Sequence, residues 1–130
     1  MKRDDQLKED VLEMYEAVSN GNEAYLENFL AKDGDVLCIG TDEKEIWSER
    51  NVIIDSLKSQ ATSGTKIVHG NIKAYSEGSI GWVVDEPKFV VADGRESKFR
   101  MTSVFHLEQG KWKLIQTHAS KGIPNSELFK

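Results

Sequence analysis

The spacing of apolar residues changes once along this chain. Apolar side chains recur every three or four positions over residues 4–19, 22–34 and 48–64, and they alternate with polar ones from Lys66 onward. The first spacing places apolar side chains on one face of a helix, whereas alternation places them on one face of a strand. The sequence therefore predicts three amphipathic helices followed by a series of strands.

Turn and cap residues mark the ends of the predicted helices. Asn20-Gly21 is typical of a helix C-terminus, and Asn22 follows as a candidate N-cap for the second helix. Ser48 is the candidate N-cap of the third helix, which ends before Gly64. The tight link between the first two helices predicts that they lie together as a lid.

One short strand is predicted between the second and third helices. Residues 35–40 contain the run Val36-Leu37-Cys38-Ile39, which is apolar on both faces. A strand of this kind is covered on both sides. Cys38 is therefore expected to be a small buried thiol.

The alternating half of the chain predicts four strands joined by tight turns. The predicted strands cover residues 66–75, 80–92, 97–107 and 111–121. The turns contain Glu77-Gly78, Asp93-Gly94 and Gln109-Gly110. Glycine supplies the positive φ that such turns require, so the strands should form an antiparallel meander. Pro87 lies within the second strand and cannot donate a ladder hydrogen bond, so a bulge or sharp bend is expected there.

The last two strands form a long hairpin with mixed faces. Strict alternation puts Arg100 and Thr102 on one face of the first strand, and it puts Trp112, His118 and Ser120 on one face of the second. Polar groups on a face that also carries tryptophan are solvated, paired or directed into a cavity. The hairpin is therefore where candidate ligand-binding side chains are expected.

These elements predict an α+β fold. Three amphipathic helices need one shared apolar surface, and a strongly bent, mainly antiparallel sheet offers it on its concave face. The expected result is a cone closed by the three helices of the N-terminal half, with a pocket inside. Residues 1–130 are expected to form a single domain, because the sequence shows no linker, repeat or low-complexity segment.

Composition narrows the range of partners and compartments. Lys and Arg number 17 against 22 Asp and Glu, which gives a net charge of −5. This balance argues against nucleic acid or an anionic membrane as a partner. Cys38 is the only cysteine, so no intramolecular disulfide forms, and the first ten residues are too polar for a signal peptide. The protein is expected to be cytoplasmic.

Short motifs spread over most of the chain resemble one family. They are VLCIGTD at residues 36–42, Trp47, Gly81-Trp82, Arg100-Met101-Thr102, and GKWKL at residues 110–114 running on to His118-Ala119-Ser120. With these motifs the chain resembles the SnoaL-like branch of the nuclear-transport-factor-two-like superfamily, which has a cystatin-like fold. The resemblance implies an α+β cone, a pocket between helices and sheet, and a homodimer formed through the outer sheet face. The pocket residues that it implies are Trp47, Trp82, Arg100, Thr102, His118 and Ser120.

Some of these residues carry candidate chemistry. An imidazole titrates near neutral pH, so His118 is the candidate general base, although a hydrogen bond within its strand would explain it as well. Arg100 can hold a carboxylate in a two-pronged contact, or it can pair with a neighbouring acid. Trp47 and Trp82 offer flat walls for an apolar ligand, and core packing explains them equally.

No metal or cofactor site is predicted. The three histidines, His69, His106 and His118, lie on separate predicted strands without a closely spaced second ligand. The sequence also contains no glycine-rich phosphate loop and no nucleophile elbow.

Three functions are compatible with these features. The first is binding of a small, largely apolar molecule, one that can bear a carboxylate, by the pocket residues named above. In it Arg100 holds the polar end of the ligand, Trp47 and Trp82 form walls, and His118 supplies a hydrogen bond. The second is an isomerase or dehydratase that uses His118 as general base and loses its pH–rate profile in His118→Ala. The third is a homodimeric association module in which side chains fill the cone and the outer sheet face binds the partner.

Overall fold

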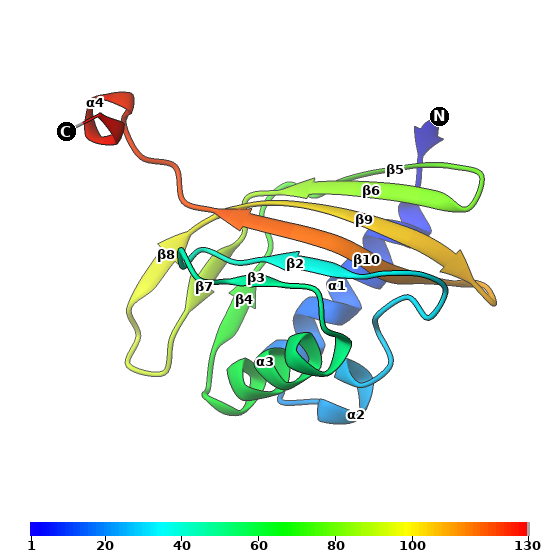
Figure 1. Cartoon of the computed structure of the whole chain (residues 1–130), viewed down its shortest axis with the longest axis horizontal. Helices are drawn as coiled ribbons and strands as arrows, with labels where there is room; N and C mark the ends of the chain where they lie inside the picture. Colours follow the sequence, from blue (N-terminus) through cyan, green and yellow to red (C-terminus); the bar gives the residue numbers. More distant parts are fainter. Residues whose placement is uncertain (130) are drawn as a thin grey trace.

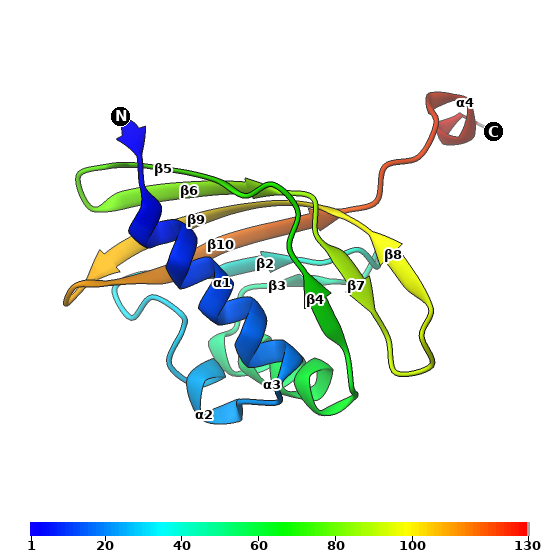
Figure 2. The same ribbon diagram turned by 180° about the vertical axis from the view of Figure 1, so that it is seen from behind.

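The computed structural model describes residues 1–129 and divides them among helices and two sheets (Figures 1 and 2). The helices are α1 (Asp5–Ser19), α2 (Glu23–Leu26), α3 (Arg50–Thr62) and α4 (Asn125–Leu128). The larger sheet consists, in spatial order, of β1 (Lys2–Arg3), β5 (Lys73–Glu77), β6 (Ile80–Asp85), β9 (Arg100–Glu108), β10 (Lys111–Ser120), β2 (Leu37–Ile39) and β3 (Ile46–Trp47). The smaller sheet consists of β4 (Lys66–Val68), β7 (Lys88–Val90) and β8 (Glu96–Lys98).

The predicted α+β cone is confirmed. Helices α1, α2 and α3 lie on one side of the larger sheet, and the smaller sheet bends down beside them (Figure 2). The strands pair antiparallel except for β2, which runs parallel to β10. The helices and the two sheets together enclose the interior, as the amphipathic pattern requires.

Three of the four predicted strands break in the middle. They split into β4 and β5, β6 and β7, and β8 and β9. One break falls at Pro87, the residue that predicts a bend, and the Phe99 N–H donates to the Pro87 carbonyl at 2.9 Å. The breaks lie beside one another, because β5 pairs with β6 on one side of them and β4 pairs with β7 on the other. The meander therefore turns as a unit and forms the side wall of the cone.

Helix α1 packs closely against the concave face of the larger sheet. Its N-cap is Asp4, whose carboxylate accepts hydrogen bonds from the Leu7 N–H at 2.8 Å and from the Ser76 hydroxyl at 2.6 Å. Leu7 is fully buried and lies so near β6 that a Cβ at Gly81 would be 2.6 Å from it. The missing side chain at Gly81 thus permits the close approach of helix and sheet.

The predicted helix ends are confirmed only in part. Asn22 does cap α2, since its side chain accepts from the Tyr25 N–H at 3.2 Å, but α2 is a single turn. The prediction that Ser48 caps the third helix is wrong, because α3 begins at Arg50 with Glu49 at the N-cap position and no side-chain cap bond. Strand β3 extends to Trp47, so the chain uses the next two residues to turn into the helix.

A β-bulge interrupts the hairpin of β9 and β10. Leu114 pairs with Phe105, and Gln116 pairs with the preceding residue of β9, Val104. Ile115 is therefore an extra residue in β10 without a partner in the ladder. From this point the side chains of β10 change faces relative to strict alternation.

The bulge corrects the predicted faces of the last strand. Trp112 is buried in the core, as expected. Beyond the bulge, Thr117 and Ala119 face the interior of the cone, whereas His118 is exposed. The prediction that Trp112 shares a face with His118 and Ser120 is therefore wrong. Side chains alternate between the two faces of a strand, and the one extra residue shifts this alternation, so the later side chains point to the opposite face.

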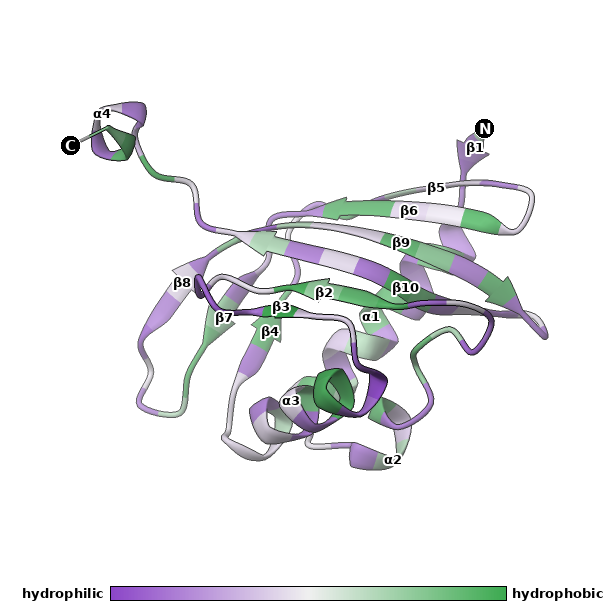
Figure 3. Cartoon of the chain, viewed as in Figure 1, coloured by the Kyte–Doolittle hydropathy of each residue, from purple (hydrophilic) through white to green (hydrophobic). Residues whose placement is uncertain are grey.

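The hydrophobic core contains residues of α1, α2 and α3 and of β5, β6, β9 and β10. Hydrophobic and hydrophilic positions are mixed along these elements (Figure 3). The C-terminal segment differs, since Ile123, Leu128 and Phe129 are exposed and α4 projects away from the rest of the chain (Figure 1). Among residues 1–129, no helix is long and apolar enough to cross a membrane.

Candidate functional site

A cavity of about 800 Å³ lies inside the cone. Its walls come from α1 and α3, from the concave side of β9 and β10, from β2 and β3, and from the smaller sheet. The apolar side chains of the lining are Met14, Tyr15, Val18, Phe29, Cys38, Ile39, Trp47, Ile53, Leu57, Ile67, Phe89, Val91, Phe99, Met101, Leu114 and Ala119. Such a volume and lining are typical of sites for small, largely apolar molecules.

Polar residues occupy a smaller share of the lining. They are Thr41, Glu45, Ser56, Ser59, Gln60, Ser63, Thr65, Arg95, Glu96, Ser97 and Thr117. Several are already engaged: Thr117 Oγ1 lies 3.0 Å from Ser103 Oγ, and Glu45 Oε1 accepts from the Asp42 N–H at 2.8 Å. A few fixed polar groups in an apolar cavity are what orients a bound molecule.

Tyr15 connects the cavity to a buried carboxylate. The Tyr15 hydroxyl donates to Asp85 Oδ2 at 2.9 Å, and Asp85 is 2 % exposed. The backbone N–H groups of Gly70 and Glu86 donate to Asp85 Oδ1 at 3.0 and 2.8 Å. Burial and the adjacent Asp85 charge raise the pKa of Tyr15 far above its usual value. The Tyr15 hydroxyl is therefore neutral, and its hydrogen bond holds it in place against the Asp85 carboxylate.

Cys38 lies half-buried in the cavity wall, which partly bears out the expected buried thiol. Burial, together with the nearby Glu45 carboxylate, raises the pKa of the Cys38 thiol to about 11. A thiol with that pKa is protonated at neutral pH, so it contributes a small apolar surface rather than a nucleophile.

Two of the three charged residues of the lining, Arg95 and Glu96, form ion pairs, and the third, Glu45, forms none within residues 1–129. Arg95 Nε lies 2.8 Å from Asp93 Oδ2, and the Arg95 side chain is 84 % exposed. Glu96 Oε2 lies 3.5 Å from Lys88 Nζ. Arg95 and Glu96 belong to the hairpin of β7 and β8, so these two charged side chains lie at the rim of the cavity.

The structure brings one of the six predicted site residues into the cavity. Trp47, on β3, is part of the lining. The other five are absent from it, and they are Trp82, Arg100, Thr102, His118 and Ser120. The predicted binding and catalytic roles of these five residues stay predictions. A ligand that contacts them would bind outside this cavity.

These five residues lie together on the outer face of the larger sheet. The ladder pairs Val84 with Thr102 and Thr102 with His118, and it pairs Arg100 with Ser120. Paired residues in neighbouring strands point to the same side. Trp82 lies two residues before Val84, so its side chain is on the same face. Its ring stacks on the ring of Tyr75, with 6.1 Å between the ring centroids.

Sequence reasoning missed most of the cavity lining. Arg95 is the clearest case, because it lies beside a turn and its sequence pattern indicates only an exposed hairpin end. Ser56 and Gln60 lie on α3, three and seven residues after the buried Ile53. This helical spacing is the only sequence signal that they share the face of Ile53. The chain bends at Pro87, and this bend places the hairpin of β7 and β8 at the rim of the cavity. The local sequence does not specify how far the hairpin extends along the cavity.

A family profile matches most of this chain. A profile described as a SnoaL-like domain matches residues 8–125. That range includes all the lining residues of the cavity. Among proteins of curated function, none matches this sequence.

Solved structures similar to this one share its fold at low sequence identity. A candidate dehydratase of the NTF2-like family from Streptomyces avermitilis is 19% identical, with 92% of this chain and 96% of that chain covered and a TM-score of 0.82. An NTF2-like protein of unknown function from Pseudomonas putida KT2440 is 10% identical, with coverage of 95% and 89% and a TM-score of 0.80. A candidate calcium/calmodulin dependent protein kinase II association domain from Xanthomonas campestris is 21% identical, with coverage of 86% and 81% and a TM-score of 0.70. Identities this low show a common fold alone.

Proposed function

This chain belongs to the SnoaL-like domain family, and from that premise we propose that it binds a small, largely apolar molecule inside the cone. The observation that carries the proposal is the cavity of about 800 Å³, with aromatic, aliphatic and sulfur-containing side chains over most of its lining. Binding in such a cavity gains from removing apolar surface from water.

The titratable groups of the lining favour binding over catalysis. Tyr15 and Cys38 are neutral at pH 7, because the pKa of each is raised. Arg95 and Glu96 are paired with Asp93 and Lys88 respectively. A general base needs a free group within reach of the substrate. The remaining charged residue of the lining, Glu45, is also engaged, since it accepts a hydrogen bond from the Asp42 N–H at 2.8 Å.

Arg95 is our candidate for the polar end of the ligand. Its guanidinium lies at the rim and keeps donors free beyond the Nε that contacts Asp93. A carboxylate on the ligand could be held there in a two-pronged contact. Trp47 would then form a wall for the apolar part.

The test uses anilinonaphthalene sulfonate, an apolar anionic dye whose fluorescence rises in apolar sites. We expect saturable binding to the wild-type protein and a loss of at least about tenfold in affinity for Ala119→Phe, because the added ring occupies the cavity. Native mass spectrometry of the protein as purified is the companion measurement, and a mass excess released by denaturation would reveal a retained ligand.

Gln116→Phe is the matched control, since Gln116 is exposed on the same strand. It should leave the dye affinity within about twofold of wild type. Dye binding that survives Ala119→Phe but is lost in Gln116→Phe would contradict the proposal and move the ligand to the outer face. Circular dichroism of both variants establishes that each one is folded.

We also propose that the outer face of the larger sheet joins two copies of the chain. Ile80 and Val84 are 40% and 45% exposed there, beside the stacked rings of Tyr75 and Trp82. Apolar side chains gathered on one exposed face are typical of a protein interface. In this arrangement His118 would lie at the interface, and its proposed role as a general base would need a substrate bound there.

A further inference from the structure

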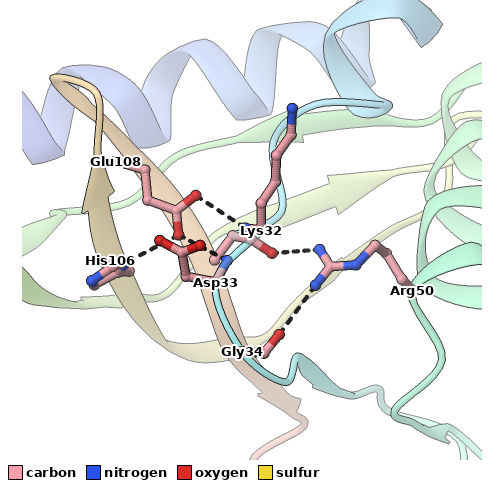
Figure 4. Close-up of polar contacts among 7 residues, drawn as sticks. Lys32, Asp33, Gly34, Arg50, His106 and Glu108 are labelled. Carbon is pink, nitrogen blue, oxygen red and sulfur yellow. Dashed lines mark hydrogen bonds and ion pairs between the residues drawn. The ribbon is translucent and has the colours of Figure 1, made fainter.

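A second cluster lies outside the cavity and consists of Asp33, His106 and Glu108 (Figure 4). One ligand atom from each residue lies within 4.8 Å of the other two. We propose that this cluster binds a divalent first-row transition-metal cation. Zn²⁺ is the example tested below, because it accepts both imidazole and carboxylate ligands.

The fold assembles the cluster from two distant segments. His106 and Glu108 are alternate residues of β9, so their side chains leave the strand on the same face. Asp33 comes from the connection between α2 and β2, 75 residues before Glu108 in the chain. The His106 Nδ1 already lies 2.9 Å from Glu108 Oε2. The sequence shows Glu108 two residues after His106, but the third ligand, Asp33, comes close to them only in the tertiary structure.

Contacts outside the cluster hold its ligands in position. The Lys32 N–H donates to Glu108 Oε1 at 3.0 Å, and the Asp33 N–H donates to Glu108 Oε2 at 3.4 Å. On the opposite side, the Arg50 guanidinium donates to the carbonyl groups of Ala31 and Gly34. Figure 4 shows the segment 31–34 held between Glu108 and Arg50. Hydrogen bonds of this kind orient metal ligands and keep their geometry fixed.

The partner of Glu108 in its one ion pair within residues 1–129 is His106, a member of the cluster itself. Within residues 1–129, neither Asp33 nor Glu108 forms an ion pair with a lysine or an arginine. The Lys32 side chain points away from both carboxylates (Figure 4). The two carboxylates therefore lie close together with an imidazole as their main side-chain neighbour. A divalent cation would neutralise their mutual repulsion.

Distances and exposure allow a metal ion to enter. The donor atoms around a four-coordinate Zn²⁺ are about 3.3 Å apart, which follows from metal–ligand distances of about 2.0–2.1 Å. The contact between His106 and Glu108 needs to open only slightly to reach that separation. Asp33 is exposed, so its carboxylate can approach by rotation of its own side chain. Water would complete the coordination on the solvent side.

The experiment is isothermal titration calorimetry of ZnCl₂ into the full chain, free of any affinity tag, at pH 7.5. We expect saturable binding with one Zn²⁺ per chain, together with a melting temperature that rises with Zn²⁺ concentration and returns to its starting value with EDTA. Asp33→Asn and His106→Ala should each weaken the affinity by about tenfold or more, because each removes a ligand.

His69→Ala is the matched control, since His69 is an exposed histidine away from the cluster. It should bind Zn²⁺ within about twofold of wild type. The proposal is overturned if no binding occurs up to millimolar Zn²⁺, or if the His69 variant loses affinity while the Asp33 and His106 variants keep it. Asp33→Asn keeps the shape of the side chain and leaves the backbone contact to Glu108 in place. A loss of binding in that variant therefore does not come from unfolding, provided that its melting temperature in EDTA matches the wild type.

Discussion

At the scale of single residues, the hydroxyl of Tyr15 is the side-chain group that stabilises the buried Asp85 charge. The other donors to Asp85 are the backbone N–H groups of Gly70 and Glu86. A buried carboxylate is costly unless hydrogen bonds satisfy it. Asp85 lies at the bend between β6 and β7, so its three donors join α1 to the place where the meander turns.

Tyr15→Phe should therefore lower the free energy of unfolding by about 1.5–3 kcal/mol, the usual contribution of a hydrogen bond to a charged group. Urea denaturation at pH 7 measures it. The matched control is Tyr25→Phe, because within residues 1–129 the Tyr25 hydroxyl makes no hydrogen bond and its removal should cost less than about 0.5 kcal/mol. Equal losses in the two variants would show that the Tyr15 hydroxyl stabilises nothing specific.

At the scale of elements, the start of α1 depends on the charge of Asp4. Burial raises the pKa of Asp4, but hydrogen bonds from Ser76 and from the Leu7 N–H outweigh it, so the pKa lies below its usual value. The folded state therefore favours the ionised form more than the unfolded chain does. This contribution to stability is present above the unfolded pKa of about 3.9, and it is lost as pH falls through the lower folded pKa.

Asp4→Ala should cost about 1 kcal/mol at pH 7, because α1 loses its N-cap. The difference from wild type should shrink as the pH is lowered from 5 toward 3. Asp4→Asn is the control that keeps a capping side chain without a charge, so its cost at pH 7 should be smaller. Thermal unfolding across this pH range is the measurement, and a difference that stays constant down to pH 3 would show that the Asp4 charge plays no part.

At the scale of the whole molecule, the proposed homodimer forms through the outer face of the larger sheet. Val84→Lys should convert a dimer into a monomer, because it places a charge among the apolar side chains of that face. Size-exclusion chromatography with light scattering measures the mass. Dye binding in the cavity should stay within about twofold of wild type, because Val84 lies on the opposite side of the sheet from the cavity.

The matched control is Val52→Lys, since Val52 is 40% exposed on α3 and Val84 is 45% exposed on β6. It adds the same charge away from the outer sheet face and should leave the mass unchanged. A wild-type protein that is monomeric at all concentrations, or a dimer that persists in Val84→Lys, would contradict the proposed interface. The cavity and the interface are thus tested separately.

Much of the fold was predictable because it depends on neighbours in sequence. Helix α1 with its end at Asn20-Gly21, the tight turns at Gly78, Gly94 and Gly110, and the bend at Pro87 were all predicted from local patterns. Backbone preferences of glycine and proline, and the spacing of apolar residues, act over a few positions. The motifs that resemble the SnoaL-like family completed the prediction of an α+β cone, and the structure confirms it.

The site was decided by contacts between distant segments. The bulge at Ile115 shifts the register between β9 and β10, and this one extra residue turns His118 and Ser120 away from the cavity. Arg95 reaches the rim because the meander folds at Pro87, and Asp33 meets His106 because the connection after α2 crosses to β9. The sequence by itself determined the elements and the class of fold. Only the tertiary structure decided which side chains face the cavity, because strand register and long-range packing fix those directions.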